Sequence, residues 1–338
     1  MNYPLISILI PCRNEELFIS GCVTSLLNQD YPSEKVEILI VDGNSTDGSL
    51  RILDEIVEKN LNVHLIANPG KIFPVAVNLG INRAKGDYIF IAGAHARYPA
   101  NYISECINFS QKYDADNIGG IIETVPLKDN FWGRLITTVL SSPFGVGNSK
   151  FRTGSSEIIE TDTVFGGCYK SNVFRKYGMF NENLVSTSDY EFNRRIKKAG
   201  ARILLVPEIK ATYYTRSALT EFLKNNIRNG FWAIYPLLFT DHFPVSLRHL
   251  IPLIFTLSLI STICLGFISK YFIYLFLTII ILYLIVCLFF SVKAAREKVV
   301  YVFSLPILFI SLHLTYGIGS LWGVVNVIYK RFFNSLKP

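Results

Sequence analysis

The sequence predicts an α/β domain with a mainly parallel sheet, followed by an α-helical membrane region. Short apolar runs alternate with helical patterns up to about residue 235, and hydrophobic residues make up 50% of the chain. Charged residues become scarce after residue 250, where three long apolar stretches follow one another. Strands that read as continuous apolar runs between helices are typical of a parallel sheet buried on both faces.

Four apolar runs predict the strands of the sheet, and helical patterns lie between them. The runs are residues 5–10, 36–42, 63–67 and 88–92. Asn14 and Ser45 are favourable N-cap residues for the helices that follow the first two runs. In such sheets ligands bind beyond the carboxyl ends of the strands. We therefore expect three segments to lie side by side at that edge: Pro11–Glu15, Asp42–Asp47 and Gly93–Arg97.

Three apolar stretches predict membrane-spanning helices, because each reaches the roughly 20 residues that a hydrocarbon core requires. They cover residues 250–268, 271–290 and 299–325, and Pro306 would allow the last to be split into two segments. Residues 219–237 mix basic and aromatic residues in an amphipathic pattern that is typical of an interfacial helix. We expect a soluble domain at 1–218, an interfacial helix and linker at 219–249, and three or four membrane helices at 250–330.

The basic residues predict the orientation in the membrane. Arg248, Lys293, Arg296 and Lys298 flank the first two stretches, whereas the loop between them carries only Lys270. The positive-inside rule then places the N-terminal domain in the cytoplasm, anchored to the cytoplasmic (inner) membrane. The net charge of +7 fits anionic membrane lipids, and no nucleic-acid-binding motif is present.

Five motifs carry a family resemblance. They read ISILIPCRNEE, EILIVDGNSTDGS, NPGKIFPVAVNLGINRAKGDYIFIAGAHARYP, TVFGGCYKSNVFRKYGMFNE and STSDYEFNRRIKKAG. Their order and spacing resemble family 2 glycosyltransferases, in particular the membrane-bound, succinoglycan-type exopolysaccharide branch, and the C-terminal HLTYGIGSLWG adds to the likeness. The resemblance covers nearly the whole chain. It implies a GT-A fold, a nucleotide-diphosphate sugar donor and inversion at the anomeric carbon.

The resemblance implies a donor site at the strand ends. Pro11, Arg13 and Glu15 would line its nucleoside pocket, and the nucleotide-sugar-binding residues would also include Asp42 and Asp47. Among them Asp42 would read the base, uracil. Lys71 would approach the donor diphosphate, where a cation stabilises the charge that develops on the leaving group. The alternatives are structural: Asp47 belongs to a simple turn, and Lys71 is a solvated surface lysine.

The resemblance also implies a metal site, and here the chain departs from its relatives. The family element is Asp-x-Asp, the succinoglycan-like branch tends toward Asp-Ala-His, and this chain has Gly93-Ala94-His95. Because Gly93 has no side chain, His95 is the single ligand candidate for manganese or magnesium, with the donor phosphates completing the coordination. The alternative is a histidine hydrogen-bonded in a turn. Arg97 would add positive charge beside the diphosphate.

On the acceptor side, Asp189 matches the general base that inverting transfer needs opposite the leaving group. Its alternative role is a helix N-cap. The family more often has Glu-Asp here, whereas this chain has Ser188, and Glu191 points to another face of the helix. The residues that match the family's acceptor region are Gly166, Gly167 and Trp232. For the two glycines the alternative is a simple turn.

Two features of the last stretches concern helix packing. Gly317, Gly319 and Gly323 permit close approach of neighbouring helices. His313 is either part of an interhelical hydrogen bond or a contact to a lipid pyrophosphate.

The resemblance thus implies an inverting enzyme that moves a hexose from a UDP-sugar to a polyprenyl-pyrophosphate-linked oligosaccharide, one sugar per encounter. Two alternatives stay open. One is a non-catalytic, transferase-like scaffold of a polysaccharide assembly complex, which Gly93 and Ser188 favour. The other is a polyprenyl-phosphate sugar synthase, which differs only in its acceptor.

Overall fold

The computed structural model describes residues 3–240, 243, 245–295 and 299–334. Contacts divide the chain into two compact units, one of residues 1–123 and 154–214 and the other of residues 124–153 and 215–338. The predicted soluble domain at 1–218 differs from this division, because residues 124–153 pack with the C-terminal helices. Of the residues that predicted the membrane orientation, Arg296 and Lys298 lie outside the described residues.

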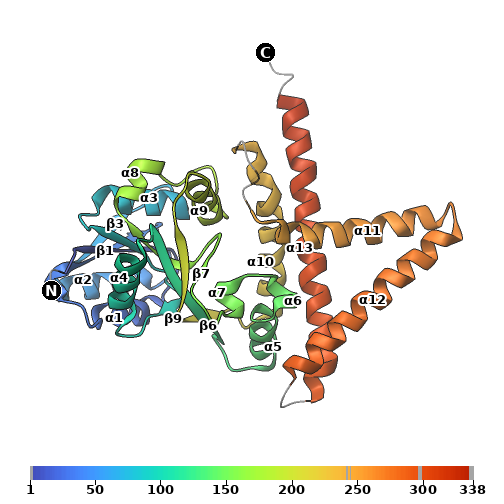
Figure 1. Cartoon of the computed structure of the whole chain (residues 1–338), viewed down its shortest axis with the longest axis horizontal. Coiled ribbons are helices and arrows are strands. Elements are labelled where there is room, and N and C mark those ends of the chain that lie inside the picture. Colours follow the sequence, from blue (N-terminus) through green and yellow to red (C-terminus); the bar gives the residue numbers. More distant parts are fainter. Residues whose placement is uncertain (1–2, 241–242, 244, 296–298, 335–338) are drawn as a thin grey trace. The chain divides into compact units, whose positions relative to one another are not determined.

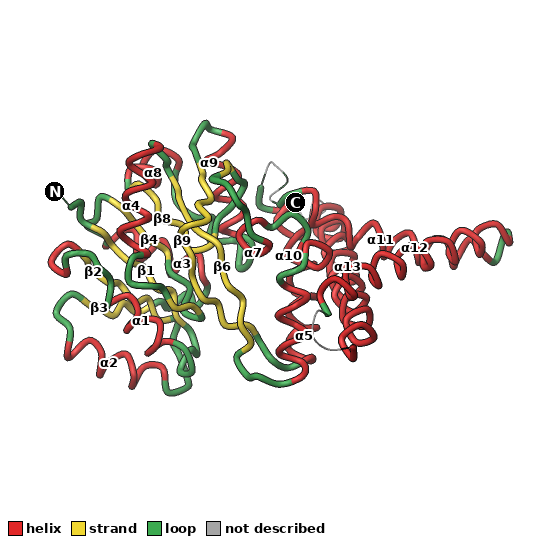
Figure 2. The backbone as a smooth tube through the Cα atoms, turned by 60° about the horizontal axis from the view of Figure 1, so that its bottom comes forward, coloured by secondary structure: helices red, strands yellow, loops and turns green. Residues whose placement is uncertain are grey.

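The first unit contains a sheet of nine strands within the described residues, in the order β3-β2-β1-β4-β8-β6-β9-β5, with β7 paired to β9 (Figures 1 and 2). The first four strands are parallel and confirm the predicted runs: β1 (Ile6–Cys12), β2 (Val36–Asp42), β3 (Val63–Ala67) and β4 (Tyr88–Ile91). The later strands are β5 (Ala96–Arg97), β6 (Asn117–Pro126), β7 (Ile159–Glu160), β8 (Phe165–Lys170) and β9 (Ile203–Thr215). Since β4 and β8 pair antiparallel, the sheet is mixed.

Six helices of this unit accompany the strands in the described part of the chain. They are α1 (Ile19–Leu27), α2 (Ser49–Lys59), α3 (Phe73–Arg83), α4 (Tyr102–Tyr113), α8 (Asn172–Tyr177) and α9 (Ser188–Lys198). Strand β1 is almost wholly buried, as its apolar sequence predicts. Helix α3 lies close to it at Gly80, where an added Cβ would be 3.0 Å from Leu9 Cδ2. The small residue therefore permits tight helix–sheet packing.

The two predicted N-caps are wrong. Helix α1 begins at Ile19 after Phe18, and α2 begins at Ser49 after Gly48. Asn14 instead accepts a hydrogen bond from the Thr46 backbone N–H, at 2.8 Å. Ser45 instead donates its hydroxyl to Asp42. The Asn14 side chain therefore links the loop after β1 to the loop after β2, and the Ser45 side chain bonds within its own loop. Sequence spacing alone does not reveal these contacts.

The second unit is helical in its described residues. Before the strands β7 to β9 the chain forms α5 (Phe131–Leu140), α6 (Pro143–Val146) and α7 (Lys150–Thr153). After β9 it forms α10 (Leu219–Ile234), the 3-10 turns η2 (Tyr235–Leu238) and η3 (Leu247–Leu250), α11 (Ile251–Gly266), α12 (Lys270–Ala294) and α13 (Val299–Asn334). Leu135, Ile136 and Val139 of α5 share a buried cluster with Leu305 and Phe309 of α13. This apolar face explains why residues 124–153 belong to the helical unit.

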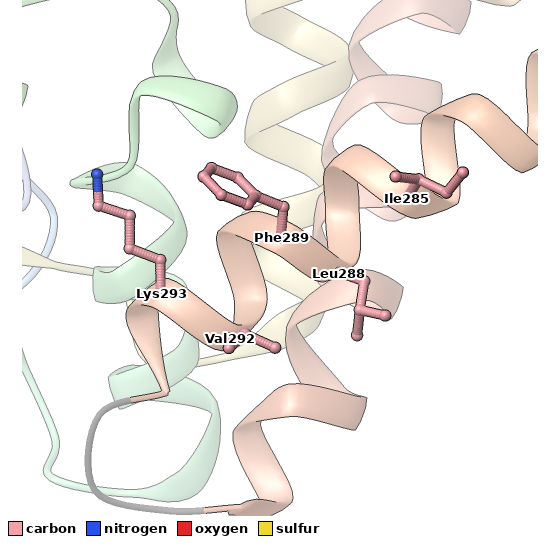
Figure 3. Close-up of a pocket in the computed structure, with 5 residues that line it drawn as sticks. All are labelled: Ile285, Leu288, Phe289, Val292 and Lys293. Atoms are coloured by element: carbon pink, nitrogen blue, oxygen red, sulfur yellow. The ribbon is translucent and has the colours of Figure 1, made fainter.

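Three helices are long and apolar enough to cross a membrane: 247–266, 270–294 and 299–332. Helix α13 continues through Pro306, so the described residues form three such segments rather than four (Figure 1). On α12, Ile285, Leu288, Phe289, Val292 and Lys293 line a shallow hollow of about 450 Å³ (Figure 3). It contains none of the predicted site residues, and its apolar side chains suit contact with lipid.

The glycines of α13 allow close packing, as predicted. An added Cβ at Gly317 would be 2.5 Å from the Pro252 carbonyl oxygen of α11, and one at Gly319 would be 2.1 Å from the Ile227 carbonyl oxygen of α10. His313 uses both ring nitrogens within the unit, at 2.7 Å from the Tyr283 hydroxyl and 3.0 Å from the Phe144 carbonyl oxygen. The interhelical alternative for His313 is therefore confirmed.

Candidate active site

Three strand ends meet at one edge of the sheet, as predicted. Strand β1 lies between β2 and β4, with Cys12 opposite Asp42 and Leu9 opposite Ile91. The loops beyond these ends touch each other: the Asn14 N–H donates to Ser45 Oγ at 2.9 Å. Burial, together with the carboxylates of Asp42, Glu15 and Asp47, raises the pKa of the Cys12 thiol. Acidic groups are thus concentrated around the end of β1.

Asp42 and Asp47 both support the loop that contains them. The Asp42 carboxylate is 4% exposed and accepts hydrogen bonds from the Ser45 hydroxyl and, at 3.0 Å, from the Ser45 N–H. Asp47 accepts from the N–H of Ser49 at 3.0 Å and of Glu16 at 3.2 Å. Desolvation acts to raise the pKa of Asp47, and these hydrogen bonds outweigh it, so the pKa is lowered. Base reading by Asp42 stays a prediction.

Arg13 and Lys71 bring two positive charges to the same edge. The Arg13 Nη1 donates to the Lys71 carbonyl oxygen at 3.5 Å, although the two residues are far apart in sequence. Lys71 has a φ of 60°, which is uncommon for a residue other than glycine. Both side chains are exposed. Two exposed cations on adjacent loops suit an anionic ligand such as a diphosphate.

His95 is hydrogen-bonded, as its structural alternative expects. Its Nε2 lies 2.8 Å from Glu15 Oε1, and its ring packs edge-on against Phe18 with centroids 4.6 Å apart. The Glu15 Oε2 atom is buried, and it has no hydrogen-bond partner among the described residues. Glu15, predicted for the nucleoside pocket, is therefore engaged with the metal-ligand candidate.

Gly93 and Arg97 lie on either side of His95 in the sequence. A Cβ at Gly93 would meet Phe165 Cζ at 3.3 Å, so an aromatic ring occupies the neighbouring space. The Arg97 guanidinium lies 5.6 Å from the centroid of the Tyr214 ring and packs beside Gly21 of α1. These contacts direct Arg97 toward α1 and β9. Its predicted place beside the diphosphate stays a prediction.

Asp189 lies in the first turn of α9, which begins at Ser188 after the N-cap residue Thr187. It is therefore not the N-cap. Desolvation raises the pKa of its carboxyl group, although the side chain is only partly buried. A carboxylate with a raised pKa is a stronger base than a solvated aspartate, and its partial exposure leaves it accessible to an acceptor hydroxyl.

The neighbours of Asp189 hold helix α9 in place. Glu191 is 3% exposed and pairs with Arg195 at 2.8 Å, and Arg195 also donates to the Met179 carbonyl oxygen at 2.7 Å. Glu191 is thus committed to structure, in agreement with the prediction that it cannot share the base role. On the next turn, Asn193 accepts from the hydroxyl of Tyr169 at 3.0 Å.

The residues predicted for the acceptor region lie in different units. Gly166 and Gly167 belong to strand β8 rather than to a turn. An added Cβ at Gly166, which has a φ of 55°, would be 3.1 Å from the Phe90 ring, and one at Gly167 would be 2.7 Å from Asn117 Oδ1. Their small size is thus required by packing within the sheet. Trp232 lies on α10 of the second unit, against Tyr235. A role for these residues in acceptor binding stays a prediction.

Sequence reasoning missed three features of this region. It did not pair Glu15 with His95, it did not place Phe165 against Gly93, and it did not find the hydrogen bond that joins Asn193 of α9 to Tyr169 of β8. Each contact joins residues that are distant in sequence. The only available signal was the prediction that the strand ends meet, which brings Glu15 and His95 to one edge.

Solved structures support the fold. The mannosyltransferase PcManGT from Pyrobaculum calidifontis, in complex with GDP-Man and Mn²⁺, has a TM-score of 0.63 with 16% identity and covers 95% of this chain and 88% of that one. TarS 1–349 of S. aureus, in complex with UDP, has a TM-score of 0.50 with 18% identity and covers 66% of this chain and 63% of that one. The GT-A-like fold with C-terminal helices is confirmed.

Curated relatives are enzymes and proteins of glycan synthesis. A Methanococcus voltae protein, named dolichyl N-acetyl-alpha-D-glucosaminyl phosphate 3-beta-D-2,3-diacetamido-2,3-dideoxy-beta-D-glucuronosyltransferase, is 33% identical over 238 residues, which cover 68% of this chain and 72% of that protein. The succinoglycan biosynthesis protein ExoA of Rhizobium meliloti is 28% identical over 214 residues, which cover 63% of this chain and 64% of that protein.

The sequence profile described as glycosyl transferase family 2 matches residues 7–183. This range includes all the strand ends described above and stops shortly before Asp189. The match spans more than half of the chain, and the predicted family is confirmed: this protein belongs to glycosyl transferase family 2.

Proposed function

We propose that this glycosyltransferase moves a hexose from a UDP-sugar to a polyprenyl-pyrophosphate-linked oligosaccharide at the cytoplasmic face of the inner membrane, in the synthesis of a surface polysaccharide. The observation that carries the chemistry is a partly buried Asp189 with a raised pKa, in the same unit as the two cations of the strand-end loops. The lipid-linked acceptor is supported by the three candidate membrane helices and by the dolichyl-linked substrate in the name of the Methanococcus relative.

The proposed reaction is a direct displacement. The acceptor hydroxyl oxygen forms a bond to the anomeric carbon of the donor while the bond from that carbon to the diphosphate oxygen breaks. The electron pair of the broken bond leaves with the nucleoside diphosphate, and the hydroxyl proton passes to Asp189. Arg13 and Lys71 stabilise the charge on the departing diphosphate, which grows in the transition state.

The site residues fit a divalent cation that is held mainly by the donor. No group of three or more His, Cys, Asp or Glu side chains able to hold an ion is found in the described residues. The His95–Glu15 pair and the buried, unpartnered Glu15 Oε2 nevertheless provide one imidazole and one carboxylate at the edge of the sheet. His95 would hold the ion, which would neutralise charge on the diphosphate.

The test is transfer of radiolabelled sugar from UDP-sugars into lipid-linked oligosaccharides by the purified full-length protein. Product on pyrophosphate-linked acceptors supports the proposal, whereas product only on polyprenyl phosphate assigns the enzyme to polyprenyl-phosphate sugar synthesis. Gly93 and Ser188 favour a second candidate, a scaffold of a polysaccharide assembly complex. A scaffold would neither transfer sugar nor hydrolyse the donor under any of these conditions.

Replacement of Lys71 by alanine is expected to raise the KM for the UDP-sugar by about 10- to 100-fold, as for loss of a hydrogen bond to a charged group. The variant lacks the ammonium group that would contact the donor diphosphate. Steady-state kinetics at varied donor concentration measure the effect. The matched control is Lys59→Ala, which removes an exposed lysine from the end of α2. If the two variants have equal KM values, Lys71 is a solvated surface lysine that does not contact the diphosphate.

The acidic limb of the pH profile should reflect Asp189. Because desolvation raises its pKa above the ordinary value of 3.8, the base becomes protonated, and hence inactive, at a higher pH than a solvated aspartate would. Activity is expected to rise with pH through that raised pKa. Measurement of kcat/KM from pH 4 to pH 8 checks this, with melting curves at each pH as the control. A flat profile down to about pH 4 would contradict the assignment.

A further inference from the structure

Three separate contacts fix the orientation of His95. Its carbonyl oxygen accepts from the Tyr214 N–H at 2.9 Å, and its ring packs edge-on against Phe18. The third contact is the 2.8 Å approach of Nε2 to Glu15 Oε1. The backbone bond holds the main chain at His95, and the contacts with Phe18 and Glu15 restrict rotation of the ring.

The contact with Glu15 also determines which ring nitrogen remains available. An ionised carboxylate only accepts hydrogen bonds, so Nε2 must be the protonated nitrogen in this pair. In the neutral imidazole, Nδ1 then carries the free lone pair. Within the described ranges of the chain, no hydrogen bond engages His95 Nδ1. The lone pair is therefore available to a ligand.

Glu15 is well placed to influence this histidine. Its side chain is 14% exposed, and its backbone N–H donates to Ser49 Oγ at 2.7 Å. The loop is thus tied to the start of α2, and the carboxylate is shielded from water. A shielded carboxylate interacts more strongly with its hydrogen-bond partner than a solvated one.

Gly93 makes the orientation of His95 important. With no side chain at position 93 and with Phe165 against it, the neighbouring strand-end residue supplies no second ligand. A cation held by one protein ligand depends on that ligand being presented in the right tautomer and direction. A carboxylate that accepts from the other ring nitrogen provides both.

We propose that Glu15 is a positioning residue for metal binding: it holds His95 with Nδ1 as the lone pair for the divalent cation, and so compensates for the missing carboxylate at Gly93. This inference rests on the proposed function, since it concerns the ion that accompanies the nucleotide donor. It assigns Glu15 to the metal region rather than to the nucleoside pocket.

The test uses the purified full-length protein with Mn²⁺ and UDP. Electron paramagnetic resonance measures free Mn²⁺, and hence affinity, and pulsed measurements detect nitrogen coupled to the bound ion. The wild type should show such coupling, and His95→Ala should lose it. Glu15→Ala should weaken Mn²⁺ binding about 10- to 100-fold. Glu15→Gln should lose less, because its amide oxygen still accepts from Nε2–H.

Glu16→Gln is the matched control. It changes the adjacent carboxylate, which accepts from the Gly48 N–H at 2.7 Å instead of contacting His95, and Mn²⁺ affinity should remain at the wild-type level. Gly93→Asp in the Glu15→Ala background should recover Mn²⁺ affinity, because it provides a second ligand. Its Cβ requires Phe165 to shift by only a few tenths of an ångström.

Two results would overturn the inference: Glu15→Ala binding Mn²⁺ as tightly as the wild type, or a wild-type Mn²⁺–UDP complex without nitrogen coupling. If Gly93→Asp does not recover Mn²⁺ affinity in the Glu15→Ala background, Glu15 does not compensate for a missing carboxylate at position 93. These outcomes are separable from the proposed function. Metal-independent sugar transfer would refute the role of Glu15 and leave the function standing, whereas nitrogen-coupled Mn²⁺ without any transfer would refute the function alone.

Discussion

Replacement of Asp189 by asparagine is expected to lower the rate of sugar transfer by about 10²- to 10⁴-fold, the range for loss of a general base. An amide of the same shape cannot accept the proton of the acceptor hydroxyl. The rate of radiolabelled transfer into lipid-linked product, at saturating donor, measures the effect. Transfer at the wild-type rate would remove Asp189 from the mechanism.

The same variant should remain folded, which separates chemistry from stability. Desolvation raises the pKa of Asp189 in the folded state, so the folded protein binds this proton more tightly than the unfolded chain. Ionisation therefore costs stability as the pH rises from the unfolded pKa through the folded one. At neutral pH the asparagine removes this cost, and the melting temperature should be equal to or higher than that of the wild type.

Glu191→Gln is the contrasting variant. It leaves Arg195 without its buried carboxylate partner and should lower the melting temperature.

A leucine at Gly230 is expected to separate α10 from α13 and to destabilise the helical unit. An added Cβ at this position would lie 2.0 Å from the Tyr316 carbonyl oxygen, a backbone atom that cannot rotate away. The Ser320 hydroxyl, which donates to the Gly230 carbonyl oxygen at 3.1 Å, would lose its partner. Overpacking typically costs about 1–3 kcal/mol, and more where backbone must move. Thermal unfolding in detergent, followed by circular dichroism, should show a melting temperature several degrees lower.

Lys224→Leu serves as the control for this helix. It places the same side chain on α10 at an exposed position, so it tests the effect of added hydrophobicity without a steric conflict. Its melting temperature should stay within about a degree of the wild type, as for most surface substitutions. If the two leucine variants have the same melting temperature, close contact between α10 and α13 does not limit stability.

The first half of the sheet could be predicted because its signal is local. Strands β1 to β4 are apolar runs whose burial follows from their own sequence, and parallel pairing then brings their ends to one edge. The two N-cap predictions failed because the Asn14 side chain accepts from the Thr46 N–H of another loop, and the Ser45 hydroxyl donates to Asp42 within its own loop. The grouping of residues 124–153 with the C-terminal helices could not be predicted for a similar reason: their apolar face is covered by α13, far along the chain.

The candidate site shows the same limit. Family motifs named Asp189, Lys71 and His95, but the motifs do not say which side chains touch. Arg97 carries the charge expected beside a diphosphate, yet its guanidinium stacks on Tyr214. Gly166 and Gly167 were predicted for the acceptor region, whereas the atoms next to them belong to Phe90 and Asn117. Roles that depend on partners distant in sequence require coordinates.

The path of the chain between the two units has a practical consequence for dissection of the enzyme. The chain leaves the sheet after β6, which ends at Pro126, then packs with the C-terminal helices and returns before β7. A fragment ending at residue 218 would keep α5 and lose α13, which exposes Leu135, Ile136 and Val139 to water. Such a fragment should aggregate even though its catalytic sheet is intact. During synthesis, too, α5 leaves the ribosome before α13, so its apolar face stays uncovered until α13 packs against it.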